Sequence, residues 1–350
     1  MGVTMCFATP FLPRITACWS SVLLVANLTS AQTSLPEEAV QLDPLTVFGR
    51  ADDMLGKAVT ASQGRVAAAE IASRPMLRRG EILEVIPGLI VTQHSGGGKA
   101  NQYFLRGYNL DHGTDLSLAA EGVPINLRTH GHGQGYADMN FVIPELVRGI
   151  TFRKGPFFAD VGDFSAAGAA RLEFWEALPH EFVSVAWGEN NHRRLVLGGT
   201  AGEVTSGAMT AAVELVQDDG PFLLPEDFAR ANVFLRHHRE TENHQLTITA
   251  TGYTAEWDST DQIPARAVAD GSLDRFGFVD PTDGGESERF SLTVASEWQR
   301  STAISSSKWT IAPSSAAPSP TRGQLAASGG RATPSACKLK SISLMKWASI

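Results

Sequence analysis

Residues 103–138 have the sequence YFLRGYNLDHGTDLSLAAEGVPINLRTHGHGQGYAD, which predicts two strands joined by a short polar loop. The first extended run ends at Arg106 and Gly107. The second has apolar residues at every other position of 116–120 and ends in the turn Glu-Gly-Val-Pro at 121–124. A long loop rich in His and Gly follows. This alternation with a period of two favours a β-rich fold.

The segments on either side extend the pattern. Residues 65–85 favour helix, and a helical stretch over 80–86 is stopped by Pro87 and Gly88 before a strand begins at Leu89. Further along, 143–156 predict a short helix, a strand and a Gly-Pro turn, and 162–174 predict a Gly-rich strand. The sequence therefore predicts a small domain of short helices and strands.

This order of elements resembles the plug domain of TonB-dependent outer-membrane receptors. The likeness is strongest from Gly80 to Pro156, where the helix with its Pro-Gly stop, the Arg-Gly strand end and the acidic-Gly-x-Pro turn follow one another. The resemblance implies an α+β plug domain with a mixed sheet over 51–177. It also implies a receptor for gated import in the outer membrane, and not an enzyme.

From residue 178 to 300 the sequence pattern changes and predicts successive strands joined by turns. Met209, Ala211, Val213 and Leu215 fall on one side of a strand and Thr210, Ala212, Glu214 and Val216 on the other. Short connections alternate with long, acidic, Pro/Gly-rich ones, as in an outer-membrane barrel with apolar residues toward lipid. We therefore expect the N-terminal antiparallel strands of an incomplete transmembrane β-barrel. A soluble β-sandwich is the alternative for this segment.

The N-terminus predicts export. Residues 15–28 form an apolar stretch followed by small residues, which favours a signal peptide over 1–31. A leader over 32–50 contains a short β-prone segment that resembles the family's TonB box: Leu45, Thr46, Val47, Phe48 and Gly49. The resemblance implies that a TonB-type energy-transducing protein of the periplasm binds it, by adding it as a strand to its own sheet.

Composition excludes several other classes. The net charge is −8, and all 37 acidic residues lie in the first 300 positions, so an acidic body would repel a nucleic acid. Three cysteines cannot build a disulfide framework. No motif for a nucleophilic, phosphate-binding or zinc-hydrolase site is complete. We therefore expect no catalytic residue and no cofactor.

The last segment, 301–350, differs from the rest. It has no acidic residue and no strand period, and it is rich in Ser, Ala, Pro and basic residues, which predicts a disordered or out-of-frame tail. The six strands expected before it are too few for plugged outer-membrane transporters, which have about 22. We therefore expect a truncated copy that does not transport.

Histidines and aromatic residues concentrate in the predicted plug loops. If the plug topology holds, they lie at one external apex beside Asp111, Asp115 and Asp138. Neutral imidazoles on Gly-rich loops can bind Zn, Ni, Cu or Fe, or a metal chelate; the alternative is a solvated polar loop with no metal. The candidate ligand-binding residues are His94, Tyr108, His112, Arg128, His130, His132 and Tyr136, and the candidate metal ligands among them are His130, His132, His112 and His94.

The function expected from the resemblance is TonB-energised uptake of a scarce ligand, such as a metal chelate or siderophore, across the outer membrane. Two other classes stay open. One is a soluble exported β-rich binding protein, and the other is a metal-binding protein that uses the plug-loop histidines.

Overall fold

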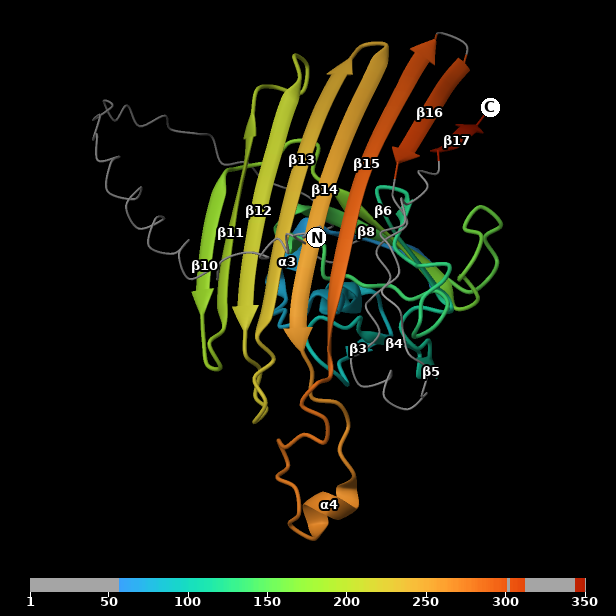
Figure 1. Ribbon diagram of the computed structural model, residues 1–350. Coiled ribbons are helices and arrows are strands. Elements are labelled where there is room, and N and C mark those ends of the chain that lie inside the picture. The colour runs from blue at the N-terminus through green and yellow to red at the C-terminus, as the bar shows by residue number, and fades with distance from the viewer. Residues whose placement is uncertain (1–56, 301–302, 312–343, 350) are drawn as a thin grey trace, which may run out of the picture. The chain divides into compact units, whose positions relative to one another are not determined.

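The computed structural model describes residues 57–300, 303–311 and 344–349 (Figure 1). The predicted signal peptide, the leader and the TonB-box-like segment Leu45–Gly49 lie outside the described residues.

The first part is built on a six-stranded sheet that we call the plug sheet. Its strands run in the order β1-β2-β8-β9-β6-β7. β6 pairs with β9 in parallel and the other pairs are antiparallel, so the sheet is mixed, as predicted. The strand bounds are β1 Lys57–Thr60, β2 Gln63–Ala67, β6 Leu116–Ala120, β7 Val123–Pro124, β8 Val147–Lys154 and β9 Gly168–Phe174.

Three helical segments and a small sheet complete the plug. The region expected to be helical over 65–85 is divided, because β2 occupies its start and Pro75 separates two helical pieces. Gly88, at φ +85°, makes the turn from the second piece into the small sheet. The bounds are α3 Ala68–Ser73, η1 Arg79–Val85, η2 Pro144–Leu146, β3 Leu89–Thr92, β4 Gln102–Leu105 and β5 Tyr108–Asn109.

The second part is an eight-stranded antiparallel sheet, which we call the wall sheet (Figure 1). Its strands pair in chain order, and its first and last strands, β10 and β17, do not pair with each other among the described residues. The bounds are β10 Phe182–Trp187, β11 Arg193–Ala201, β12 Ala208–Asp218, β13 Phe228–Thr241, β14 His244–Asp258, β15 Gly284–Arg300, β16 Ala303–Ile311 and β17 Leu344–Ser349.

The two faces of the wall sheet differ in polarity. Along β12, Met209 is 50% exposed while its neighbours Ala208 and Thr210 are buried. The outer face carries exposed apolar side chains, including Val183, Val185, Trp187, Leu197, Met209, Val233, Leu235, Phe290 and Leu292. The inner face packs on the plug. A soluble sandwich would bury its apolar strand faces against each other, so this arrangement contradicts that alternative and fits a lipid-facing wall.

The described connections between wall strands differ in length, and both long ones lie at one end of the sheet, where the short turn 188–192 also lies. The turns at 202–207 and 242–243 are short and lie at one end of the sheet, whereas 219–227 and 259–283 are long and lie at the other. The connection 259–283 contains helix α4, Ala265–Ala269, which Figure 1 shows below the sheet. Among the described residues, no helix has the length and apolarity needed to cross a membrane.

Part of the predicted tail is described. Residues 303–311 and 344–349 are strands β16 and β17, and they continue the antiparallel pairing from β15. Disorder was one of the two predictions for 301–350, and these two segments instead form strands. The rest of 301–350 lies outside the described residues, and whether the segment is out of frame stays a prediction.

Candidate functional site

The plug apex gathers histidines from three loops. His94 lies in the first, His112 in the second, and His130 and His132 in the third. The ring centroids of His94 and His112 are 5.0 Å apart, and those of His112 and His132 are 4.5 Å apart. The structure therefore brings all four predicted histidines into one cluster, together with Tyr136. We call these five residues the apex cluster.

His112 is the fixed centre of the apex cluster. Its side chain is 2% exposed, and its Nδ1 lies 2.8 Å from the carbonyl oxygen of Ala100 and 3.1 Å from that of Asn101. Carbonyl oxygens only accept, so Nδ1 carries the hydrogen and Nε2 presents its lone pair. Nε2 is buried and has no hydrogen-bond partner among the described residues. Burial, followed by the nearby His132, lowers the pKa of His112 to about 4, so the ring is neutral at pH 7.

The third loop is held by stacking and by its own backbone. The ring of His130 stacks on Tyr136 with centroids 3.8 Å apart and planes 6° apart. The backbone N–H of His132 donates to Nδ1 of His130 at 3.1 Å, and the backbone N–H of Ala100 donates to the Tyr136 hydroxyl at 2.7 Å. Burial, followed by His132, lowers the pKa of His130 to about 4. Two loops are thus tied together beneath the exposed His132.

A carboxylate completes the group. Asp111 has a positive φ of 52°, and its backbone N–H donates to the Asn109 side-chain oxygen at 2.8 Å, which fixes the turn. Its Oδ1 lies 3.7 Å from Nε2 of His112. Potential ligand atoms of Asp111, His112 and His132 all lie within 4.8 Å of one another. This set could hold a metal ion after small side-chain adjustments.

Other predicted site residues are placed elsewhere. Tyr108 is 65% exposed on β5 and Arg128 is exposed, and neither makes a ring or hydrogen-bond contact with the apex cluster among the described residues. Asp138 is turned toward the wall sheet, where its Oδ2 accepts from the Tyr253 hydroxyl at 3.1 Å. Burial raises the pKa of Asp138. Asp138 is therefore a plug–wall contact.

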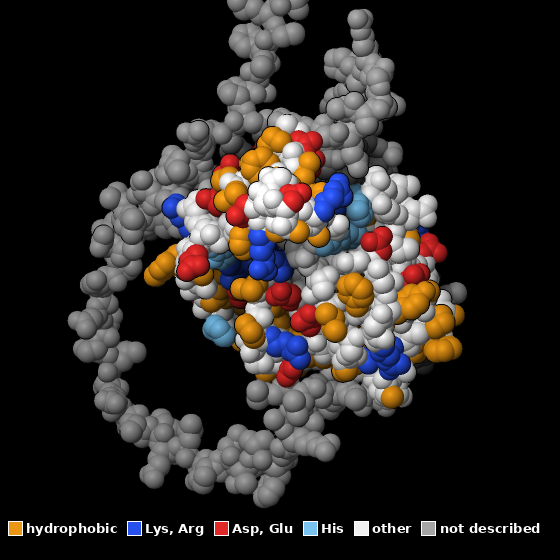
Figure 2. Space-filling model, turned by 90° about the horizontal axis from the view of Figure 1, so that it is seen from below, with side chains coloured by type: hydrophobic (Ala, Val, Ile, Leu, Met, Phe, Trp, Pro, Cys, Tyr) orange, Lys and Arg blue, Asp and Glu red, His pale blue; other side chains and the backbone are white. Residues whose placement is uncertain are grey.

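A cavity of about 710 Å³ lies between the plug and the wall sheet at the end with the long connections. His94 of the apex cluster lines it, as does Asp261 of the long connection 259–283. Figure 2 views the chain from this end and shows basic, acidic and histidine side chains exposed on it. The plug side of the lining includes Arg79, His94 and Asn140, and the wall side includes Arg194, Glu226, Arg230 and Asp261.

A buried ionic network joins the plug to the inner face of the wall sheet. Glu214 of β12 is fully buried and pairs with Arg79 of the plug, with Arg194 at 2.7 Å and with Arg230 at 3.4 Å. Arg194 also binds both oxygens of plug residue Glu145, at 2.7 and 2.8 Å. The sequence analysis did not predict this network. Its signal was a carboxylate at an inward position of an otherwise apolar strand, which requires buried partners.

The plug loop over 93–99 also docks on the long connections. The Gly96 N–H donates to the Ser259 hydroxyl at 3.1 Å, and the Gly97 N–H donates to a carboxylate oxygen of Glu226 at 2.8 Å. Gly98 faces the Trp257 ring, and a Cβ there would lie 1.9 Å from it. This loop therefore connects the apex cluster, through His94, to the outer connections of the wall.

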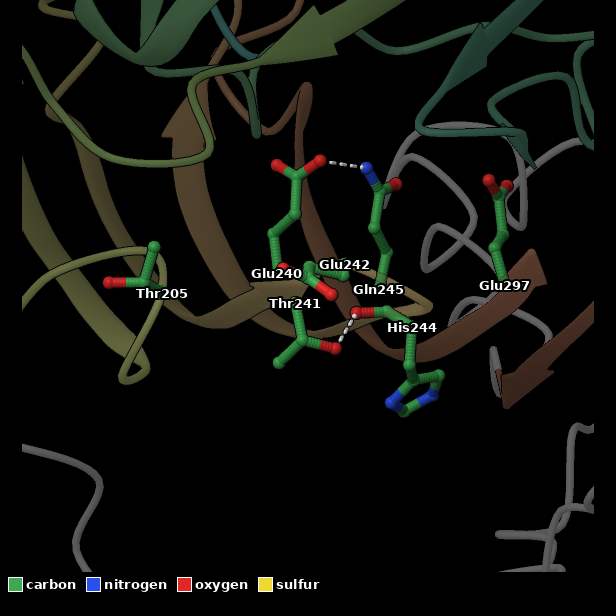
Figure 3. Close-up of a pocket in the computed structure, with 7 residues that line it drawn as sticks. All are labelled: Thr205, Glu240, Thr241, Glu242, His244, Gln245 and Glu297. Carbon is green, nitrogen blue, oxygen red and sulfur yellow. Dashed lines mark hydrogen bonds between the residues drawn. The ribbon is translucent and has the colours of Figure 1, made fainter. Parts of the chain in front are cut away.

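A second, smaller pocket lies at the end with the short turns (Figure 3). There the Thr241 hydroxyl donates to the His244 carbonyl at 3.0 Å, and the Gln245 amide donates to Glu240 at 2.6 Å. The His244 ring stacks on Trp298 with centroids 4.0 Å apart. The two hydrogen bonds close the hairpin between β13 and β14, and the stacked rings join β14 to β15, so we assign these contacts a structural role.

Comparison with known proteins agrees with this architecture. Residues 56–169 match the family model "TonB-dependent Receptor Plug Domain". Among solved structures, the ferric citrate transporter FecA matches with a TM-score of 0.57 at 16% identity, over 75% of this chain and 41% of that one. The copper transporter OprC matches with a TM-score of 0.54 at 17% identity, over 74% of this chain and 38% of that one. The siderophore receptor PirA from Acinetobacter baumannii matches with a TM-score of 0.53 at 17% identity, over 72% of this chain and 40% of that one. The chain spans about two fifths of the length of these receptors.

Proposed function

Because this chain carries the plug domain of the TonB-dependent outer-membrane receptors, followed by strands with the fold of their wall, we propose that it serves TonB-energised uptake of a scarce ligand. Members of this family are transporters and not enzymes. The ligand class we propose is a metal ion, a metal chelate or a siderophore. The observation that carries the proposal is a plug held by polar contacts on the inner face of a sheet whose outer face is apolar and exposed.

The plug–wall contacts suggest how uptake would be gated. Pulling on the plug has to break the pairs that Arg79 and Glu145 make with the wall, and it has to free the loop that carries His94. A ligand held between that loop and the wall would lose contacts when the plug moves. Work done on the plug would thereby lower ligand affinity, which is the coupling that release requires.

The partner we propose is a TonB-type energy-transducing protein of the periplasm. Its docking segment would be Leu45–Gly49, a short β-prone run that can add to a partner's sheet edge. This segment lies outside the described residues, so the proposal rests on its sequence and on its position ahead of the plug. Substituting Val47 by Pro removes a backbone donor and is expected to abolish partner binding.

We also propose that the 350-residue chain by itself does not transport. The wall sheet is open between β10 and β17 among the described residues, and an unpaired strand edge in lipid leaves backbone groups without hydrogen-bond partners. Ligand uptake by cells that carry only this chain would contradict this point and would leave the family assignment untouched.

Cell fractionation tests the proposed location and the remaining alternative together. The chain is expected in the outer-membrane fraction, with its wall strands resistant to protease until the membrane is dissolved. Release of the chain by osmotic shock, with the periplasmic proteins, would support a soluble exported binding protein and would overturn the proposal.

A further inference from the structure

We infer that Asp111, His112 and His132 form a binding site for one divalent late transition-metal ion, such as Zn²⁺, Ni²⁺ or Cu²⁺, at the plug apex. Binding itself does not depend on the proposed function. The further step, that the bound ion is the transported ligand, rests on it.

His112 has one ring nitrogen that is ready to bind a metal ion. Its Nδ1–H donates to the carbonyl oxygens of Ala100 and Asn101. The Nε2 lone pair is therefore buried and directed toward Asp111, and it has no hydrogen-bond partner among the described residues. A buried acceptor without a partner is costly in a folded protein. A ring whose far nitrogen donates to a backbone carbonyl is also the arrangement found behind metal-binding histidines, since it fixes the tautomer and the ring plane. A metal ion at Nε2 supplies the missing partner.

The three side chains of the site offer nitrogen and oxygen donors together. Two imidazoles and one carboxylate suit Zn²⁺, Ni²⁺ and Cu²⁺, whereas Mg²⁺ and Ca²⁺ prefer sites made only of oxygen. His132 stands on a Gly-flanked loop and is exposed, so it can move the short distance to an ion at His112. Three protein ligands leave a position for water or for His94, whose ring centroid is 5.0 Å from that of His112.

The site lies beside a cavity and has a negatively charged surrounding. His94 lines the cavity between the plug and the wall, and its ring centroid lies 5.0 Å from that of His112, so the cavity reaches the edge of the site. Around His132 the charged neighbours are Asp111, Asp261 and Lys99. Two carboxylates against one ammonium leave a net negative surrounding for a cation. Asp261 belongs to a long connection of the wall, so the site has charges from both parts of the chain.

Metal binding to the full chain tests the inference. Chelator-treated chain in detergent is dialysed against buffered free Zn²⁺, and bound zinc is measured by mass spectrometry. We expect one tightly bound Zn²⁺ per chain. Loss of even a supporting residue weakens metal sites about 10- to 100-fold, so His132→Ala and Asp111→Asn are each expected to weaken binding by at least about tenfold. Both residues are exposed, so both variants should fold.

His180→Ala is the matched control, because His180 is exposed just before β10 and belongs to the other part of the chain. It is expected to bind Zn²⁺ as the wild type does. Binding by Asp111→Asn and His132→Ala at wild-type affinity, or an equal loss in His180→Ala, would overturn the site. Cu²⁺ provides a second readout, since its paramagnetic resonance spectrum should show coupling to two ring nitrogens in the wild type and to one in His132→Ala.

The two proposals fail separately. A chain found in the outer membrane that binds no Zn²⁺ would leave the receptor proposal standing and remove the metal site. A chain released with periplasmic proteins that still binds Zn²⁺ through Asp111 and His132 would keep the metal site, and would remove the receptor proposal and with it the view of the ion as cargo.

Discussion

Arg194 of the wall sheet and Glu145 of the plug form a two-point ion pair, with nitrogen–oxygen distances of 2.7 and 2.8 Å. The guanidinium also reaches Glu214 at 2.7 Å, so one wall residue links a plug carboxylate to the buried network of its own sheet. Planar two-point pairing fixes direction as well as distance. This pair therefore sets where the short helix η2 sits on the wall.

Glu145→Gln is expected to loosen the plug without unfolding it. The change removes the charge at a partly exposed position and leaves Arg194 paired with Glu214, so the cost should be about 1 kcal/mol. The urea midpoint for loss of protease protection of the plug measures it. Glu70→Gln is the control, because Glu70 pairs with Arg74 inside the plug. An equal shift in both variants would contradict a specific plug–wall role.

Glu214→Ala is expected to have a much larger effect. It leaves Arg79, Arg194 and Arg230 near one another without their shared carboxylate, and breaking a buried pair in this way costs about 3–5 kcal/mol. The same protease assay should show a plug that is cut under conditions in which the wild type is intact. Wild-type protection in Glu214→Ala would mean that water or movement of the arginines relieves the network.

Gly98→Ala tests the docking of the plug loop on Trp257. An added methyl group would lie 1.9 Å from the indole ring, so the ring or the loop must move, at a cost of about 1–3 kcal/mol. We expect a shift in tryptophan fluorescence and earlier unfolding of the plug. Gly131→Ala serves as the control because nothing lies within 4 Å of a Cβ there. Unchanged fluorescence in Gly98→Ala would contradict the contact.

Asp138 gives a pH dependence with a definite sign. Burial raises its pKa above the ordinary 3.8, so the folded chain keeps the proton over a range in which the unfolded chain loses it. Asp138 therefore stabilises the folded state fully at pH values below about 3.8, where both states hold the proton. This stabilisation is lost as the pH rises through the raised pKa of the folded state. Relative to the wild type, Asp138→Asn should gain stability as pH rises from 4 to 7. A constant difference between the two proteins over that range would contradict the shift.

Much of the fold followed from local patterns. The Pro87-Gly88 stop, the Arg106-Gly107 strand end and the alternation in β12 each depend on residues next to one another, so the sequence predicted these elements and the two-faced wall. The mixed plug sheet was an implication of the family resemblance, and the structure has it. The division of 65–85 was not predicted. Residues 63–67 pair with β8, more than eighty residues away, and that pairing overrides their helical preference.

The site was predicted in part for the same reason. His94, His112, His130 and His132 stand out in Gly-rich loops, and the plug topology implied that these loops meet. The orientation of Asp138 toward Tyr253 and the burial of Glu214 depend on contacts between segments more than a hundred residues apart, or on neighbouring strands. A single sequence gives no direct sign of such contacts, so the distinction between Asp111 as a cluster member and Asp138 as a wall contact required the structure.

If the chain works as proposed, the wall sheet turns its apolar face to lipid and its polar face to the plug. Spin labels attached at Met209→Cys and Val233→Cys on that apolar face, in chain recovered in outer-membrane lipid, test it most directly, with Val279→Cys of the long connection as an exposed reference. We expect frequent collisions of the two wall labels with dissolved oxygen and few with a water-soluble nickel chelate. Collisions with the nickel chelate as frequent as those at Val279 would contradict it.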